Sequence, residues 1–118
     1  TVLNDVTLRG IPTPTHKIFE SSAPVGPWIV PKDQIADPQN LKLIMRINGE
    51  QVQEGSTSSM LASIHAMAAH CSKWMTLIPG DILATGDLGS TDPIKPGDIM
   101  EVEVEGVGVL RNPVKLED

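Results

Sequence analysis

Apolar and polar residues alternate over residues 41–47, a period-two pattern that predicts a strand with one buried and one solvated face. The apolar positions of this stretch are Leu41, Leu43, Met45 and Ile47. The Asn-Gly pair at 48–49 follows directly, and it supplies the two positive-φ positions of a type I′ turn. The pattern therefore predicts a β-hairpin that returns through residues 51–53.

Alternation recurs near the C-terminus, where apolar residues at 100, 102 and 104 are separated by glutamates at 101, 103 and 105. This pattern is typical of an antiparallel strand with one solvated face. The glycines at 106 and 108 predict a bulge or tight bend before residues 109–110. Two Pro-Gly-Asp-Ile runs, at 79–82 and 96–99, predict two turns of the same chemistry, the first leading into a strand at 82–85.

The period changes after Ser58. Apolar residues now recur at steps of three and four, behind a Ser- and Thr-rich start that can cap a helix, at Leu61, Ile64, Ala68, Cys71 and Met75. This spacing predicts one helix, roughly from Ser59 to Trp74. Residues 10–27 contain Pro and Gly too densely for a continuous helix. Together the patterns predict a mainly β (α+β) fold with one principal helix.

Composition and charge narrow the possible partners. The 118 residues suit a single domain, and an aromatic content of 3% leaves a thin core that would gain from burial against another segment or subunit. The net charge of −6, with no cluster of Lys or Arg, disfavours nucleic acid and anionic membranes as partners. No apolar run approaches the roughly 20 residues of a membrane-spanning helix.

The single cysteine and the first residues give expectations about the cellular location of the chain and its place in the gene product. Cys71 stands alone, which excludes an intrachain disulfide, and its place in the predicted apolar helix favours a buried, reduced thiol. A cytoplasmic or organelle-matrix location is expected from this. The chain starts with Thr1 and enters a strand-like Val2-Leu3 at once, so we expect it to begin inside a longer gene product.

Three charged residues near the N-terminus are candidates for chemistry. Asp5 could give a carboxylate to a hard cation such as Mg²⁺, which usually takes several oxygen ligands, although no second acid lies within the next twelve residues. Lys17 and Arg9 could orient a carboxylated substrate and stabilise a developing enolate. The alternative for Asp5 is a turn or cap residue, and for the two cations a solvated surface charge.

Other reactive side chains have simpler explanations. His16, His65 and His70 match no metal-ligand spacing, since the last two are five residues apart and not on one helix face, and we interpret all three as structural. The Ser and Thr residues at 56–59 lack the sequence of a nucleophile elbow. Helix capping accounts for them.

Short motifs follow one another in a fixed order through nearly the whole chain: Asn4–Arg9, Lys17–Phe19, Pro24–Trp28, Asn48–Glu50, Gln53–Gly55, Leu77–Gly86, Lys95–Asp98, Glu105–Gly108 and Leu110–Asn112. In this order they resemble the C-terminal half of the fumarylacetoacetate hydrolase superfamily. The resemblance implies a mixed β-roll, in which residues 1–118 are the C-terminal part of a catalytic domain. The N-terminal part of that domain is expected to lie outside this sequence.

The resemblance also implies an activity and a site. Members are metal-dependent hydrolases, decarboxylases or tautomerases that act on C–C bonds of 2-oxo acids or acylpyruvates through a metal-stabilised enolate. Mg²⁺ or Mn²⁺ would be held by two glutamates and one aspartate, and Asp5 matches the aspartate. Lys17 matches the active-site lysine, and Thr85 and Gly86 match a loop lining the substrate pocket. Arg9 matches a further substrate-binding position, and a homodimer, a larger assembly or association with the N-terminal segment is expected.

The chain departs from the family pattern at three places. The paired glutamates and the His/Glu pair of the mobile lid are not in this sequence. Gly10 follows Arg9 where the family usually has Asp, and Asp87-Leu88 replaces the usual Thr-Pro. These departures favour an alternative interpretation, a non-catalytic structural half or a degenerate repeat of such an enzyme.

Overall fold

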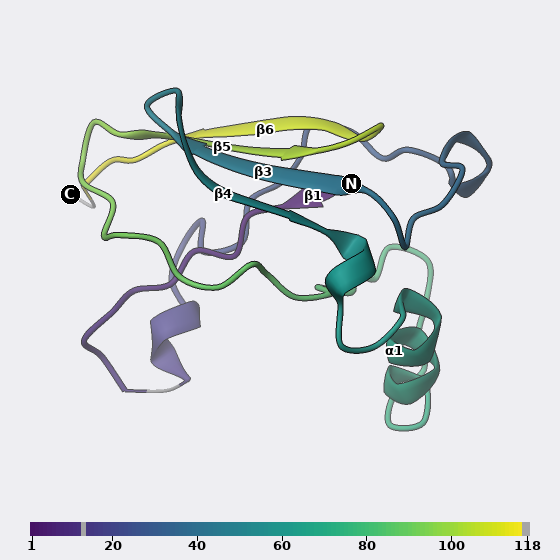
Figure 1. The fold of residues 1–118 in the computed structure, drawn as a ribbon. Helices are drawn as coiled ribbons and strands as arrows, with labels where there is room; N and C mark the ends of the chain where they lie inside the picture. Colours follow the sequence, from purple (N-terminus) through teal and green to yellow (C-terminus); the bar gives the residue numbers. More distant parts are fainter. Residues whose placement is uncertain (13, 117–118) are drawn as a thin grey trace.

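A four-stranded antiparallel sheet forms the upper layer of the molecule in the computed structural model, which describes residues 1–12 and 14–116 (Figure 1). The strand order is β4-β3-β5-β6. The strands are β3 (Lys42–Ile47), β4 (Glu50–Ser56), β5 (Ile99–Val104) and β6 (Gly108–Pro113). A two-stranded sheet of β1 (Val2–Leu3) and β2 (Val25–Gly26) lies beneath it. The predicted, mainly β fold with one principal helix is confirmed.

The first predicted hairpin is present. Asn48 and Gly49 have φ angles of 53° and 83° and join β3 to β4, as a type I′ turn requires. The pairing of the two strands shifts register between Met45 and Arg46, which marks a bulge. The central strand β3 also pairs with β5, so that it lies between its hairpin partner and the second hairpin.

The two Pro-Gly-Asp motifs form the same turn. In each, the aspartate carboxylate accepts from the backbone N–H three residues earlier: Asp81 from Ile78 at 2.9 Å and Asp98 from Lys95 at 2.7 Å. The second motif also meets the first hairpin, because Asn48 donates to the Asp98 carboxylate at 2.8 Å. These bonds confirm that one turn chemistry is used twice.

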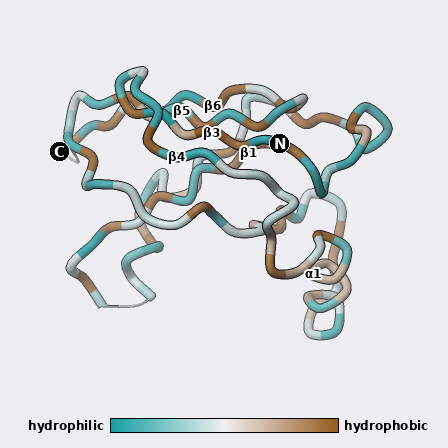
Figure 2. The backbone as a smooth tube through the Cα atoms, in the orientation of Figure 1, coloured by the Kyte–Doolittle hydropathy of each residue, from teal (hydrophilic) through white to brown (hydrophobic). Residues whose placement is uncertain are grey.

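Charged side chains on the outer face of the sheet form ion pairs across neighbouring strands. These pairs are Lys42–Glu54 (2.9 Å), Arg46–Glu103 (2.7 Å) and Arg111–Glu101 (3.5 Å). The alternation of polar and apolar positions along the strands is visible in Figure 2. The solvated face predicted for 100–104 is therefore confirmed, and because these pairs face water, their attraction adds little to stability.

The core of the described residues is small and lies on the inner face of the sheet. Val2 is 1% exposed and packs with Val107 and Leu110. Partly buried residues surround this cluster, namely Val30, Ile35, Leu41, Val102 and Val104. Because Val2 belongs to β1 and Leu110 to β6, the small sheet packs against the large one through this core.

Residues 27–35, which include the short 3₁₀ helix η2 (Lys32–Gln34), cross the end of the β5–β6 hairpin. The crossing is close: a Cβ on Gly108 would lie 3.1 Å from the Trp28 ring and 3.3 Å from Pro27. Gly108 also has a φ of 136°, which side chains rarely adopt. Its small size thus lets the Gly-Pro-Trp motif pack against the hairpin.

The helix is shorter than the sequence predicts. Helix α1 spans Ile64–Cys71, and the Ser63 hydroxyl caps it by accepting from the Ala66 N–H at 3.1 Å. The predicted start at Ser59 is wrong, since Thr57–Ser59 form a separate 3₁₀ turn, η3. No residue of α1 is buried, and the predicted burial of Cys71 is therefore wrong too. The predicted strand at 82–85 is also wrong, because those residues pair with no strand in the described part of the chain.

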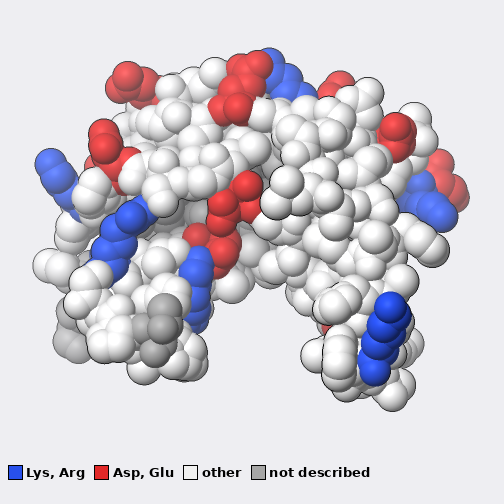
Figure 3. Space-filling view, turned by 60° about the horizontal axis from the view of Figure 1, so that its bottom comes forward, with Lys and Arg blue, Asp and Glu red and all other residues white. Residues whose placement is uncertain are grey.

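Much apolar surface is exposed. The accessible area is 8555 Å², whereas a folded monomer of this mass has about 6,200 Å². Large apolar side chains that remain exposed include Leu61, Trp74, Met75, Ile78 and Ile82. Figure 3 shows a broad hollow on the underside of the molecule, between two projecting parts. The predicted need for burial against another segment or subunit agrees with this excess.

Membrane-spanning helices are not found among the described residues, where every helix is too short or too polar for that role.

Replacing Gly108 with Ala is expected to destabilise the protein, because the new Cβ would press on the Trp28 ring and hold an unfavourable φ. The expected loss is about 1–3 kcal/mol in the free energy of unfolding, measured by urea denaturation of the full-length protein. Gly97→Ala is the matched control, because Gly97 also has a positive φ (94°) but faces no atom within 4 Å. Equal losses in the two variants would contradict the proposed contact with Trp28.

The Asp98 turn is expected to make stability depend on pH. Hydrogen bonds from Asn48 and from the Lys95 N–H lower the pKa of the exposed Asp98 carboxyl below its ordinary value. A lowered folded-state pKa stabilises the fold above the unfolded pKa of about 3.9, and this stabilisation is lost as the pH falls through the folded pKa. Wild type should therefore exceed Asp98→Asn in stability at neutral pH, and the difference should shrink in acid. A difference independent of pH in urea titrations would contradict this assignment.

Candidate functional site

An irregular backbone ladder brings the N-terminal segment beside residues 16–24. The N–H groups of Asn4, Val6 and Leu8 donate to the carbonyls of Pro24, Ser22 and His16 at 3.0, 2.9 and 2.9 Å. This ladder continues the β1–β2 pairing beyond the small sheet. It places residue 5 opposite the 3₁₀ helix η1 (Thr15–Lys17), even though twelve residues separate them in the sequence.

Asp5 and Lys17 meet across this ladder. The Lys17 Nζ atom lies 2.5 Å from Oδ1 of Asp5, and the two side chains are 36% and 40% exposed. Because both groups remain accessible to solvent, their attraction adds little to stability. The pair therefore presents a carboxylate and an ammonium group side by side at an open surface.

Asn4 anchors the carboxylate from the opposite side of the chain. It is 6% exposed, and its Nδ2 atom donates to Oδ1 of Asn112 in β6 at 3.1 Å. Neighbouring side chains of an extended segment point to opposite faces, so a buried Asn4 turns Asp5 outward. The Asn-Asp motif thus combines an internal anchor with an exposed acid.

His16 holds a polar atom that no sequence pattern singles out. Its Nδ1 atom is buried and has no hydrogen-bond partner among the described residues. The residue sits in η1, directly before Lys17. The spacing of the three histidines could not reveal this difference between them, because burial of one ring nitrogen leaves no periodic signal in the sequence.

The other predicted site residues are not brought to the Asp5–Lys17 pair by any hydrogen bond or ion pair among the described residues. Arg9 lies in an exposed turn beside Gly10. Thr85 is half-buried and Gly86 is exposed, with a φ of 112°, in an irregular segment. The predicted substrate-binding roles of Arg9, Thr85 and Gly86 stay predictions.

The segment that follows Gly86 is held along strand β4. Gln53 donates to the Gly89 carbonyl at 2.9 Å, and the Leu88 side chain lies directly over Gly55. The Asp87 carboxylate accepts from the Gly89 N–H at 2.7 Å. Asp87, which departs from the family pattern, therefore has a structural role in a local turn.

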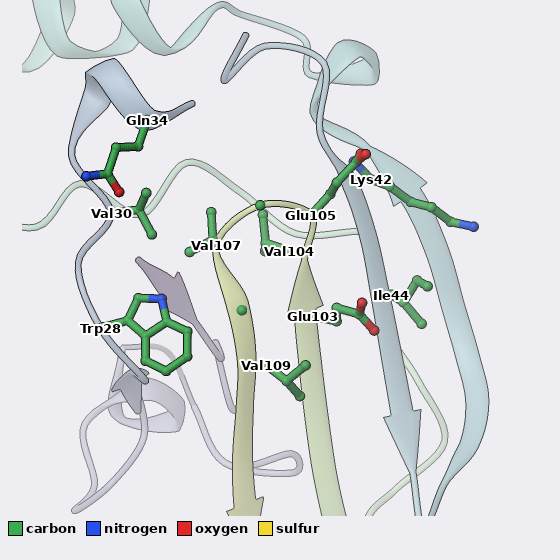
Figure 4. Close-up of a pocket in the computed structure, with 12 residues that line it drawn as sticks. Trp28, Val30, Gln34, Lys42, Ile44, Glu103, Val104, Glu105, Val107 and Val109 are labelled. Carbon is green, nitrogen blue, oxygen red and sulfur yellow. The ribbon is translucent and has the colours of Figure 1, made fainter. Parts of the chain in front are cut away.

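A cavity of about 610 Å³ lies away from these residues, between the 28–34 segment and the end of the second hairpin (Figure 4). Trp28, Val30, Ile44 and Val109 give it apolar walls, and Glu103 and Glu105 stand at its side. None of the predicted site residues lines it. The Asp5–Lys17 pair and this cavity are thus separate features.

The sequence profile of the family described as "Fumarylacetoacetate (FAA) hydrolase C-terminal" matches residues 1–115. This match covers nearly the whole chain and includes both members of the ion pair. The chain belongs to the fumarylacetoacetate hydrolase family.

Similar proteins of this family include several enzymes. The chain is 39% identical to a 4-hydroxyphenylacetate degradation bifunctional isomerase/decarboxylase from Salmonella dublin, with 100% of this chain and 29% of that protein covered. It is 42% identical to a mitochondrial oxaloacetate tautomerase from Bos taurus, with coverage of 90% and 48%. Among solved structures, the maleylpyruvate hydrolase from Sphingobium in complex with manganese(II) and pyruvate superposes with a TM-score of 0.92 at 33% identity, covering 98% of this chain and 43% of that one.

These coverages show that the chain spans about half or less of the length of the relatives it matches. Over the matched part, the chain nevertheless has the same fold as the hydrolase. It therefore has the C-terminal fold of the fumarylacetoacetate hydrolase family.

The residues present fit one position of a divalent metal site. No three His, Cys, Asp or Glu side chains in residues 1–12 and 14–116 come close enough to hold an ion together. Asp5 is exposed and offers a hard carboxylate oxygen, the ligand type that Mg²⁺ and Mn²⁺ prefer. Among the described residues, Asp5 could therefore supply one ligand of such a site but not a complete set.

Proposed function

We propose that this chain is the C-terminal part of a metal-dependent enzyme of the fumarylacetoacetate hydrolase family. Its reaction class is hydrolysis, decarboxylation or tautomerisation of 2-oxo acids or acylpyruvates through an enolate. The observation that carries the proposal is the exposed Asp5–Lys17 pair, held on the backbone ladder by the buried Asn4. Relatives that bind manganese and pyruvate, or that act on oxaloacetate, support the substrate class.

Asp5 would hold the metal ion, with Mg²⁺ or Mn²⁺ as the candidates. When bound, such an ion acts as a Lewis acid that polarises the oxygens of a 2-oxo acid. The aspartate is suited to this because its neighbour Asn4 is fixed against β6, which limits the positions that the carboxylate can take. Glutamate ligands from elsewhere in the protein would complete the site.

Lys17 would act on the substrate. An ammonium group within reach of the metal-binding carboxylate can attract the substrate's carboxylate and balance the negative charge that develops as the enolate forms. Its ion pair with Asp5 keeps it positioned before substrate arrives. Thr85, Gly86 and Arg9 are proposed to contribute further substrate contacts.

Association with the rest of the protein, or with a second copy, would complete the enzyme. The exposed apolar side chains of Leu61 and of residues 74–83 would be covered in that assembly. A stable obligate interface buries roughly 2,000 Å² or more, and the area in excess of a typical monomer is of this order.

Asp5→Asn in the full-length protein is expected to weaken Mn²⁺ binding by at least about 100-fold, because loss of a direct ligand should cost no less than loss of an outer partner. Isothermal titration calorimetry measures the affinity. Asp33→Asn, at an exposed 3₁₀ turn far along the chain, is the control and should bind as wild type does. Equal affinities in wild type and Asp5→Asn would exclude the metal role and favour a non-catalytic half.

Lys17→Met is expected to lower kcat for oxaloacetate or an acylpyruvate by about 10²–10³-fold, because the ammonium group balances charge that appears only in the transition state. Mn²⁺ affinity should change far less than in Asp5→Asn. The matched control is Lys32→Met, which removes an exposed lysine of η2. A Lys17→Met enzyme with undiminished turnover would rule out this role for the lysine.

A further inference from the structure

We propose that His16 is a positioning residue for the Lys17 ammonium group, and that its buried Nδ1 atom receives a hydrogen-bond partner in the complete enzyme. The inference rests on the proposed function, because that function assigns Lys17 its role. It adds a residue that belongs to none of the motifs matching the family. Three observations on the 8–18 loop carry it.

The first observation is the position of His16 in the backbone. The His16 carbonyl accepts from the Leu8 N–H at 2.9 Å, which is the last bond of the ladder that carries Asp5. The Lys17 N–H in turn donates to the Pro14 carbonyl at 3.1 Å, closing the turn η1. The backbone of His16 thus links the turn that contains Lys17 to the segment that contains Asp5.

The second observation concerns the directions of the two side chains. A 3₁₀ helix has about three residues per turn, so neighbouring side chains diverge by about 120°. Lys17 extends to Asp5, and its side chain is 36% exposed. The Nδ1 atom of His16 is instead withdrawn from solvent. The Nδ1 atom of the imidazole is therefore on the inner side of the turn, whereas the ammonium group is on its outer side.

The third observation is the missing partner. Within the described residues, His16 Nδ1 is the buried side-chain nitrogen or oxygen atom that has no hydrogen bond. Leaving such an atom unpaired carries an uncompensated desolvation cost, which an apolar side chain at the same place would avoid. The exposed Leu8, Ile11 and Ile18 in the same loop show a surface that a further segment can cover. A polar group on such a segment would satisfy Nδ1 and fix the turn.

The test compares His16→Leu with His16→Asn in the full-length protein. Leu fills space without polarity, whereas Asn can place a polar atom close to the position of Nδ1. With Mn²⁺ and oxaloacetate or an acylpyruvate, His16→Leu is expected to lower kcat about tenfold with KM and Mn²⁺ affinity unchanged, the scale of an outer-sphere positioning group. His16→Asn should restore most of the turnover. His65→Leu, at an exposed position of α1, is the control.

Nuclear magnetic resonance gives a readout that does not depend on activity. In metal-free wild type and His16→Asn, the Lys17 ammonium signal should be visible, because pairing with Asp5 slows its exchange with water. In His16→Leu that signal should be lost. Nitrogen shifts of ¹⁵N-labelled histidine should also show a hydrogen-bonded Nδ1 at His16 in wild type.

The outcomes separate the two proposals. If wild type neither binds Mn²⁺ nor turns over the substrates, the proposed function fails, and the ammonium signal still decides whether His16 positions Lys17. If His16→Leu keeps both the signal and full turnover, the positioning role is overturned. Equal loss in His16→Leu and His16→Asn also overturns it, because packing rather than a polar contact would then explain the effect.

Discussion

Burial of Val2 is the contact on which the arrangement of this chain depends. Val2 lies in a strand of only two residues, and it is nevertheless among the best-buried side chains of the described structure, packed against Val107 and Leu110. Burying a side chain of this size contributes about 1.5–3 kcal/mol. Without it, little would hold β1 beneath the four-stranded sheet. Asn4 and Asp5 follow immediately, so the position of the carboxylate depends on an apolar contact three residues away.

The elements that the sequence predicted correctly are those whose partners are close in the sequence. The hairpin at Asn48-Gly49 needs only its own turn and the alternation on either side, and strand β5 pairs with the next strand along the chain. The two Pro-Gly-Asp turns bond to residues three positions away. In each case the residues close in the sequence were sufficient to predict the element.

The elements that were predicted wrongly need a partner that the described residues do not supply. Residues 82–85 have strand-like composition but no neighbouring strand, and a strand without a ladder partner stays irregular. The apolar spacing from Leu61 to Met75 predicts a buried helix face, yet α1 is short and none of its residues is buried. Apolar periodicity indicates that one face of a segment packs against another part of the folded protein. It does not identify which part that is.

The candidate site shows the same difference between what local patterns predict and what depends on distant contacts. Asp5 and Lys17 were each named from family motifs, whereas the backbone ladder that brings them into contact runs between segments without regular periodicity. The anchoring of Asn4 by Asn112 joins residues 108 positions apart, and no local pattern indicates such a pair. Similarly, the sequence marks Asp87 only as a departure from the family pattern, and the structure adds that its carboxylate accepts a hydrogen bond within a local turn. The sequence could name candidate residues, whereas it could not predict the contacts that these residues make.

The ion pairs on the outer face of the sheet have an electrostatic consequence for the order of binding. Their three cations and three anions cancel, so the net charge of −6 belongs to the remaining surface. Such a field concentrates divalent cations near the molecule and repels dianionic substrates. In the proposed enzyme, a divalent ion held by Asp5 would offset part of this negative potential. A dianionic substrate would then associate faster with the ion bound than without it, and added salt would reduce the difference.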